Sequence, residues 1–264
     1  MGLRKENARM DYEKTVRSGE APQKRTKTMG DDIYTNLRSY IIELKIRPGE
    51  VVSIKEIAEV WNVGRSPVRD ALIRLEKEGL ITSLPQRGTM ISRINLHRVE
   101  EERFLRACLE ENTVSIFMKQ HTEEDIESLK KCLNDQKESV QNHDCRKLLR
   151  CDDNFHKVFF AAADKMLCWE TLQNVSGHYR RVRLLTLLQR VILDNIIIQH
   201  EEILECIIHK NEEKLQKLLK YHLEKINREE LELQERYPDL FDREQVLRRK
   251  PAYFLQSDFL QKLE

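Results

Sequence analysis

Apolar residues recur at the spacing of an α-helix through most of the chain after residue 95, and this pattern limits the fold more than any other feature. The recurrence appears in two stretches, first in Phe104, Ala107, Cys108, Val114 and Phe117 and later in Ile203, Ile207, Leu215, Leu218 and Leu219. The 264 residues include only 8 Gly and 6 Pro, and 34% are charged, which suits long amphipathic helices better than a turn-rich β fold. We therefore expect a mainly α protein, with an all-α helical bundle of about six helices after residue 95.

The length of the chain exceeds that of one typical domain, so two compact units with tails are expected. We assign residues 1–28 to a flexible leader, 29–94 to an N-terminal domain, 95–230 to the helical domain and 231–264 to a C-terminal tail. The tail contains a short amphipathic stretch, Tyr253–Leu263, to which we assign no role. The net charge of +1 decides neither for nor against nucleic acid as a partner.

Two short helices joined by a turn are predicted in the N-terminal domain. Ser53 and Glu56 form a capping box at the start of the first helix. A tight turn at 62–64 follows, after which Ser66 is expected to cap the second helix with Pro67 at its first helical position, and Gly79 ends it. This layout is a helix-turn-helix, the arrangement of a DNA-reading unit.

The flanking segments complete a small domain. Ile33, Leu37 and Ile41 predict a preceding helix, which Pro48-Gly49 stops. After the second helix of the pair, residues 80–83 and 89–92 flank a Pro- and Gly-containing segment and predict a β-hairpin, which we interpret as the wing of a winged helix-turn-helix.

The start of the second helix of the pair is chemically suited to DNA. Arg65, Ser66 and Arg69 lie there, and an arginine can bind a guanine edge through two hydrogen bonds while a helix N-terminus favours a phosphate. Lys55 on the preceding helix, together with Gln86, Arg87 and Gly88 in the wing, would supply supporting contacts. The alternative is that these charges are only the solvated face of a helical hairpin.

The stretch from Ile33 to Ile91 resembles the winged helix-turn-helix of the GntR family of bacterial regulators. Many positions match in register, among them Leu37, Pro48-Gly49, Ile57-Ala58, Arg65, Pro67-Val68-Arg69, Leu75, Glu78-Gly79-Leu80 and Gly88. The resemblance implies that Arg65 and Arg69 are the principal DNA contacts and that Ser66 touches a base or phosphate. The chain departs from the family at Gly64, where the family commonly has Ser.

A possible metal site is suggested in the helical domain. Asp152 and His156 are four residues apart, so on a helix both side chains project from one face. His200 and His222 lie on later predicted helices, and three imidazoles with one carboxylate would suit zinc or another divalent transition metal. Spacing alone leaves a surface Asp-His pair as the stronger alternative.

Residues 97–228 resemble the FCD ligand-binding domain that accompanies the GntR reader in the FadR subfamily. The matching elements are Arg106 to Glu110, Asp152 to His156, His200 to Ile203 and Tyr221 to Leu223. The resemblance implies that Asp152, His156, His200 and His222 hold a metal, expected to be Zn with Ni or Mn as alternatives. It also places Arg106 in an effector cavity, where its guanidinium could pair with a ligand carboxylate; an ion pair with Glu110 is the alternative.

Other residues of the helical domain are weaker candidates. Tyr179, Arg180 and Arg183 share a predicted helix that could line the same cavity, whereas His178 is weaker still. The chain departs from the family at Asp164-Lys165, where an Asn usually follows the Asp-x-x-Phe-His helix. The local turn, rather than the metal set, is therefore in question.

Together these features predict a cytoplasmic transcription regulator and not an enzyme. No signal-type segment or membrane span is present, and six cysteines without a CxxC pair indicate reduced thiols. We expect a homodimer on a pseudo-palindromic operator. Its effector would be a small organic or sugar acid, and repression relieved by a metabolite is the commoner outcome that the resemblance implies. A metal sensor and, more remotely, a metal-dependent hydrolase remain as alternatives.

Overall fold

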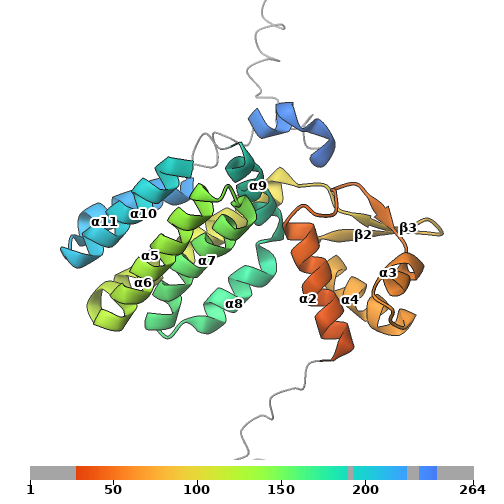
Figure 1. Cartoon of the computed structure of the whole chain (residues 1–264), viewed down its shortest axis with the longest axis horizontal. Coiled ribbons are helices and arrows are strands. Elements are labelled where there is room, and N and C mark those ends of the chain that lie inside the picture. Colours follow the sequence, from red (N-terminus) through yellow and green to blue (C-terminus); the bar gives the residue numbers. More distant parts are fainter. Residues whose placement is uncertain (1–27, 190–192, 225–231, 243–264) are drawn as a thin grey trace, which may run out of the picture.

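The computed structural model describes residues 28–189, 193–224 and 232–242, which form a small N-terminal domain beside a larger helical domain (Figure 1). The N-terminal domain contains α2 (Met29–Ile42), β1 (Val51–Val52), α3 (Ile54–Val60), α4 (Arg65–Lys77), β2 (Ile81–Leu84) and β3 (Gly88–Ile91). The helical domain contains α5 (Leu96–Gln120), α6 (Glu123–Gln141), α7 (Cys145–Ala162), α8 (Met166–Val175), α9 (Gly177–Leu188), α10 (Leu193–Ile208) and α11 (Glu212–Glu224). The prediction of a mainly α protein is confirmed.

Helix starts in the N-terminal domain follow local capping signals, with one correction. The capping box of Ser53 and Glu56 is present as predicted. The expectation that Ser66 caps the next helix is wrong, because α4 begins at Arg65 and the extended conformation of an N-cap is adopted by Gly64. Ser66 and Pro67 therefore lie inside the first turn of α4.

The predicted hairpin is present as two strands of a three-stranded antiparallel sheet. The strand order is β1-β3-β2, with Ile81 opposite Ile91 and Val51 opposite Met90. At Gly88 the backbone has φ +111°, and an added Cβ would lie 2.9 Å from the carbonyl oxygen of Val52. Glycine is thus required where the hairpin approaches β1. Strand β1 was not expected, since two residues are too few for a periodic signal.

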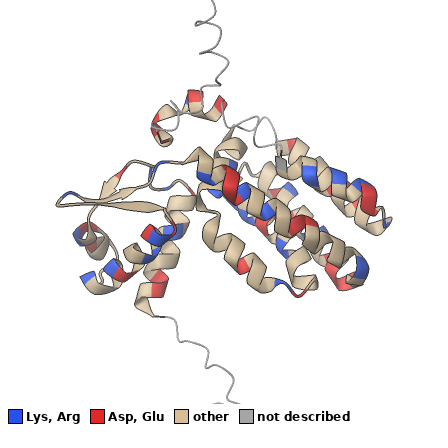
Figure 2. Ribbon diagram, turned by 180° about the vertical axis from the view of Figure 1, so that it is seen from behind, with Lys and Arg blue, Asp and Glu red and all other residues tan. Residues whose placement is uncertain are grey.

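The N-terminal domain has its own apolar core between α2, α3, α4 and the sheet. Leu37, Ile41, Val68, Ala71 and Leu75 are at most 1% exposed. Because these residues recur at helical spacing on α2 and α4, the opposite face of α4 is left to solvent. Figure 2 shows Lys and Arg positions, coloured blue, interspersed with Asp and Glu positions, coloured red, along the helices of both domains.

Seven helices of the helical domain lie within the described residues, against the approximate six expected. The difference includes the break between α8 and α9, where Ser176 is the last flanking residue of one helix and the first of the next. The main core joins α5, α6, α7, α10 and α11 and contains Phe117, Leu129, Phe155, Phe159 and Ile203. Among the described residues, no helix is long and apolar enough to cross a membrane.

Helix α9 packs directly on the N-terminal domain. A Cβ added at Gly177, its first residue, would lie 2.5 Å from Leu80 Cδ2. Arg181, fully buried on the same helix, donates from Nη1 to the carbonyl oxygen of Ser92 over 2.6 Å. The two domains are therefore joined by packing as well as by the chain itself.

Residues 232–242, here called the C-terminal segment, fold back onto the connection between the two domains. Ile94 donates its N–H to the carbonyl oxygen of Leu240 over 2.8 Å and accepts from Asp242 over 3.0 Å, which forms a parallel bridge between Ile94 and Phe241. Leu233 and Phe241 are fully buried in a cluster with Ile94. The short η1 (Pro238–Leu240) lies within this segment. The leader at 1–27 and the amphipathic stretch at 253–263 lie outside the described residues.

Candidate functional site

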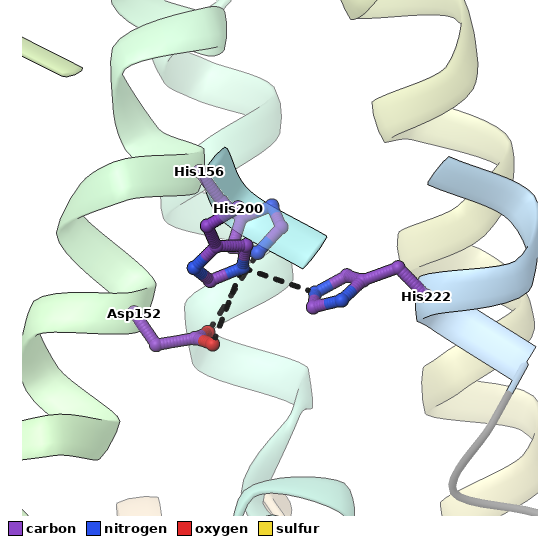
Figure 3. Close-up of side chains that lie close together, drawn as sticks. All are labelled: Asp152, His156, His200 and His222. Atoms are coloured by element: carbon purple, nitrogen blue, oxygen red, sulfur yellow. Dashed lines mark hydrogen bonds and ion pairs between the residues drawn. The ribbon is translucent and has the colours of Figure 1, made fainter. Parts of the chain in front are cut away.

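Four polar side chains meet inside the helical domain (Figure 3). Asp152 and His156 come from α7, His200 from α10 and His222 from α11, and one ligand atom of each lies within 4.8 Å of the others. The Nε2 of His200 is 3.7 Å from Asp152 Oδ1 and 3.3 Å from His222 Nε2. The spacing of Asp152 and His156 places both on the inward face of α7, where His156 Nε2 lies 3.7 Å from Asp152 Oδ2.

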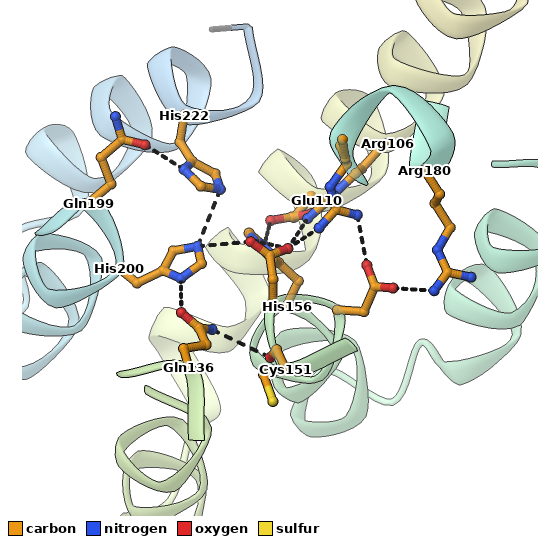
Figure 4. A network of polar contacts seen from close by, with 12 residues as sticks. Arg106, Glu110, Gln136, Cys151, His156, Arg180, Gln199, His200 and His222 are labelled. Carbon is orange, nitrogen blue, oxygen red and sulfur yellow. Dashed lines mark hydrogen bonds and ion pairs between the residues drawn. The ribbon is translucent and has the colours of Figure 1, made fainter. Parts of the chain in front are cut away.

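The Nδ1 atom of each histidine, which faces away from the centre of the cluster, contacts a side-chain oxygen on a neighbouring helix (Figure 4). Gln136 Oε1 accepts from His200 Nδ1 and Gln199 Oε1 accepts from His222 Nδ1, both over 2.7 Å, while Glu110 contacts His156 Nδ1. A glutamine oxygen can only accept, so the proton of these imidazoles lies on Nδ1 and the Nε2 lone pair points inward. This is the arrangement that orients histidines toward a metal.

The electrostatics of the cluster keep its histidines neutral. Burial lowers the pKa of His156 and His222 well below the ordinary value, and it lowers that of His200 to about 4. Burial alone would raise the pKa of Asp152, but Arg183, followed by His156 and His200, brings it down to about 2. The site thus offers neutral nitrogens and an ionised carboxylate at pH 7, the protonation state that a transition metal requires.

One buried atom lacks a hydrogen-bond partner at the centre of the cluster. Within the described residues, His156 Nε2 is buried and accepts no hydrogen bond. A buried polar atom without a partner carries a free-energy cost, and a metal bound to the four inward-facing groups would remove it. The residues present therefore fit a divalent transition metal.

Arginines border the cluster. Arg106 Nε donates to Glu110 over 3.0 Å and its Nη2 lies 3.9 Å from Asp152 Oδ2. The alternative ion pair with Glu110 is therefore present, and Arg106 also lies beside the Asp/His cluster. Arg183 pairs with Asp152 and, over 2.7 Å, with Asp153. Tyr179 is buried, with its ring centroid 5.9 Å from Arg106 Cζ and 5.7 Å from Arg183 Cζ. Three of the four expected effector residues are thus brought together.

Arg180 does not join this group. Its Nη2 donates to Asp153 over 2.6 Å, and its side chain lines a separate cleft between α2 and the helical domain. His178, the weakest candidate, has an interdomain position instead. Its Nδ1 accepts from the Asn95 N–H and from Arg181 Nη2, both over 3.0 Å, and its Nε2 donates to the carbonyl oxygen of Gly79 over 3.1 Å.

Sequence reasoning missed the residues that hold the histidines. Glu110 was considered only as a partner of Arg106, and neither Gln136 nor Gln199 was considered. Asp153, which lies between Arg180 and Arg183, was also missed. An acidic residue beside Asp152 on a helix was a signal for Asp153, but a lone glutamine carries none.

The predicted DNA-reading residues lie on the surface of the N-terminal domain. Arg65, Ser66 and Arg69 are exposed on the first turns of α4, and Arg65 and Arg69 form no ion pair with any described residue. Lys55 is exposed on α3, 3.8 Å from Glu59 Oε1. Gln86 and Arg87 are exposed in the hairpin turn, whereas Gly88 is half-buried against β1.

An exposed helix-turn-helix with a wing, attached to a helical domain with a buried Asp/His cluster, is the arrangement of a DNA-binding transcription regulator. Residues 29–91 match the bacterial regulatory proteins of the gntR family, and residues 103–225 match the FCD domain. The chain belongs to the GntR family and carries an FCD domain. It is a transcription regulator and not an enzyme.

Relatives of known name and structure agree with this assignment. The HTH-type transcriptional repressor RspR of Escherichia coli K12 is 28% identical over 219 residues, which cover 83% of this chain and 96% of RspR. A transcriptional regulator of Streptomyces ambofaciens is 26% identical over 210 residues, covering 80% of this chain and 88% of that protein. Among solved structures, E. coli McbR/YncC superposes with a TM-score of 0.68 at 17% identity, covering 80% of this chain and all of that one.

Proposed function

We propose that the chain is a ligand-responsive repressor of the FadR subfamily that binds operator DNA as a homodimer in the cytoplasm. Arg65, Ser66 and Arg69 would read the major groove, with Lys55, Gln86, Arg87 and Gly88 supporting the contact. The exposure of the first turns of α4 supports this proposal, as does the name of RspR, a repressor 28% identical to this chain.

We further propose that the DNA-binding domain spans residues 29–94 and the FCD domain residues 95–230, with a leader at 1–28 and a tail at 231–264.

The response to a ligand is supported by one observation. Three Nε2 atoms and one carboxylate point toward a common centre, and a hydrogen bond at Nδ1 fixes the orientation of the imidazoles. Asp152, His156, His200 and His222 would hold Zn, or Ni or Mn, which would supply a Lewis-acidic position for a ligand oxygen. Arg106 and Arg183 would then bind the carboxylate of a small organic or sugar acid, with Tyr179 against it. Arg180 would act through Asp153 rather than by touching the ligand.

The proposal is tested by elemental analysis and operator binding with wild type and His200→Ala. Wild type is expected to carry about one metal per chain and to release its operator when the effector acid binds, because only a ligand with unequal affinity for two states can shift them. His200→Ala should lose the metal and the response. Unchanged metal content in this variant would contradict the assigned site.

A metal sensor is the second candidate, because the same Asp/His cluster could serve to detect the metal itself. Titration of operator affinity with Zn, with and without a panel of organic acids, separates the two functions. A steep dependence on free metal alone identifies the sensor, whereas a dependence on the acid at saturating metal identifies the metabolite-responsive regulator.

A further inference from the structure

A cleft bordered by charged side chains lies between the two domains, and none of the four residues of the Asp/His cluster lines it. This cleft has a volume of about 260 Å³ and is bordered by α2 on one side and by α7, α8 and α9 on the other. The charged side chains that line it are Arg38, Glu43, Arg146, Arg150 and Arg180. Both domains therefore contribute guanidinium groups to one small space.

Positive charge predominates in the cleft. Arg38 pairs with Glu78 over 2.6 Å, Arg150 pairs with Glu43 over 2.8 Å, and Arg180 shares Asp153 with Arg183. Arg146 has no carboxylate partner among the described residues, and its Nε donates to the carbonyl oxygen of Glu43 over 2.9 Å. Lys45 adds a further positive charge at Glu43. Arg38 thus pairs with Glu78, Arg150 and Lys45 pair with Glu43, and Arg180 has only Asp153, which also pairs with Arg183, as a carboxylate partner in the ranges described. The five cations around the cleft outnumber these three carboxylates.

The arginines retain unused donors. A guanidinium has five N–H groups, and each contact above uses one or two of them. The side chain of Arg180 is 13% exposed, and its Nε is buried without a hydrogen-bond partner in the described part of the chain. Burial, together with the charges of Arg183 and Arg38, keeps the pKa of Arg180 below its ordinary value, although the charge of Asp153 acts in the opposite direction.

We propose that this cleft binds a small multivalent oxyanion and so joins α2 of the DNA-reading domain to α7 and α9 of the FCD domain. Clustered anionic oxygens would accept from the Arg146, Arg150 and Arg180 donors, which suit carboxylate and phosphate geometry. This site is distinct from the Asp/His cluster, although Asp153 connects them because it contacts both Arg180 and Arg183. A bound anion would stabilise one orientation of the DNA-reading domain, whichever ligand the Asp/His cluster takes.

The site is tested by calorimetric titration of the full chain with inorganic phosphate, and separately with citrate, at ionic strength held constant with NaCl. We expect saturable binding that is weakened at least tenfold in Arg150→Gln and in Arg146→Gln. Arg150→Lys keeps the positive charge but loses the planar guanidinium that can donate two parallel hydrogen bonds, so its affinity should lie between those of wild type and Arg150→Gln. Lys147→Gln on the same helix is the matched control, because Lys147 pairs with Glu138 outside the cleft, and it should bind like wild type.

A second arm distinguishes this cleft from the metal centre. Inorganic phosphate should bind His200→Ala as tightly as wild type, and its binding should slow amide exchange in both α2 and α7. Several outcomes would overturn the proposal: no saturation above the NaCl background, wild-type affinity in both Arg146→Gln and Arg150→Gln, or loss of phosphate binding in His200→Ala. The last result would place the anion at the Asp/His cluster. The preference between phosphate and citrate identifies which oxyanion class fits.

Discussion

Each imidazole of the Asp/His cluster depends on a single acceptor behind it. Gln136 is fully buried, and besides holding His200 its Nε2 lies 3.4 Å from the carbonyl oxygen of Cys151. Loss of this side chain would free the His200 ring to rotate or change tautomer. The position of the inward-facing Nε2 of His200 is therefore set by a residue outside the Asp/His cluster.

Gln136→Leu should lower zinc affinity by about 10- to 100-fold, the usual effect of losing such a partner. The change keeps the side-chain size but removes the acceptor for His200 Nδ1. Competition with a chelator of known zinc affinity measures the affinity of each protein for zinc. Gln120→Leu is the control, since Gln120 is exposed and contacts only the carbonyl oxygen of Ala162 among the contacts described. Equal zinc affinity in the two variants would show that Gln136 does not orient the His200 ring.

His178 makes the junction between the domains sensitive to acid. Its Nδ1 accepts two hydrogen bonds, and burial, followed by the charge of Arg181, lowers the pKa of His178 well below its ordinary value. In the unfolded chain the histidine has an ordinary pKa of about 6.5. Below that pH the unfolded state binds a proton that the folded state refuses, so the free energy of unfolding falls as the pH falls.

His178→Gln should remove this pH dependence of the free energy of unfolding. The glutamine oxygen can accept and its amide can donate in place of the two ring nitrogens, and glutamine does not titrate. Between pH 7.5 and 5.5 the metal-free wild type should lose about 1 kcal/mol more stability than the variant. Urea unfolding of both proteins at the two pH values gives the loss of stability in each. The contributions of His156, His200 and His222 are the same in both proteins and cancel in the difference. An identical loss in the two proteins would mean that His178 is protonated in the folded chain.

At the scale of elements, α4 has a buried face and a solvent-exposed face. Val68, Ala71 and Leu75 point into the core, while Arg65 and Arg69 face solvent. Replacing either arginine should therefore leave the fold intact and affect only the interaction with DNA.

Arg65→Ala and Arg69→Ala should each weaken binding to the selected operator by about 1–3 kcal/mol, the range for loss of an arginine that reads a base. Lys77→Ala, at the other end of α4, is the control and should bind normally. Fluorescence anisotropy with operator and with random duplex gives affinity and specificity together. Normal specificity in both arginine variants would exclude α4 as the reading helix.

The C-terminal segment lies beyond residues 103–225, which match the FCD domain, yet it is packed into this molecule. Phe241→Ala should destabilise the chain by about 3–5 kcal/mol, because it empties a fully buried aromatic position. Leu167→Ala, at a leucine that is 77% exposed, should change stability by less than about 0.5 kcal/mol. Chemical denaturation measures both. A small effect at Phe241 would show that the segment is not held on Ile94.

Elements with local signals were predictable from the sequence, whereas long-range contacts were not. The capping box at Ser53 and the hairpin depend on residues a few positions apart, so their patterns are visible in the chain. The Asp152 and His200 pairing depends on how α7 and α10 pack, and only the family resemblance suggested it. Nothing in the sequence indicated that Phe241 would pair with Ile94, because the docking of a chain end leaves no periodic pattern.

On the scale of the whole molecule, metal binding should be coupled to folding. The four candidate ligands come from three helices, so the site exists only when the bundle is formed. Any ion that binds the folded chain alone then adds to the free energy of unfolding.

Zinc at about 1,000 times its dissociation constant should stabilise the metal-free chain by about 4 kcal/mol. Thermal unfolding measures the change. Mg²⁺ at the same concentration should have no effect, since this ion prefers oxygen ligands, and His200→Ala should respond to neither ion. A zinc effect that persists in His200→Ala would place the binding elsewhere.

The tight approach of Gly177 to Leu80 connects the Asp/His cluster to the N-terminal domain through one helix. Helix α9 begins at Gly177 and also carries Arg183, which pairs with Asp152. Because a Cβ at Gly177 would lie 2.5 Å from Leu80 Cδ2, a rotation or shift of α9 would displace Leu80 as well. A ligand that moved Arg183 would therefore change the position of the N-terminal domain.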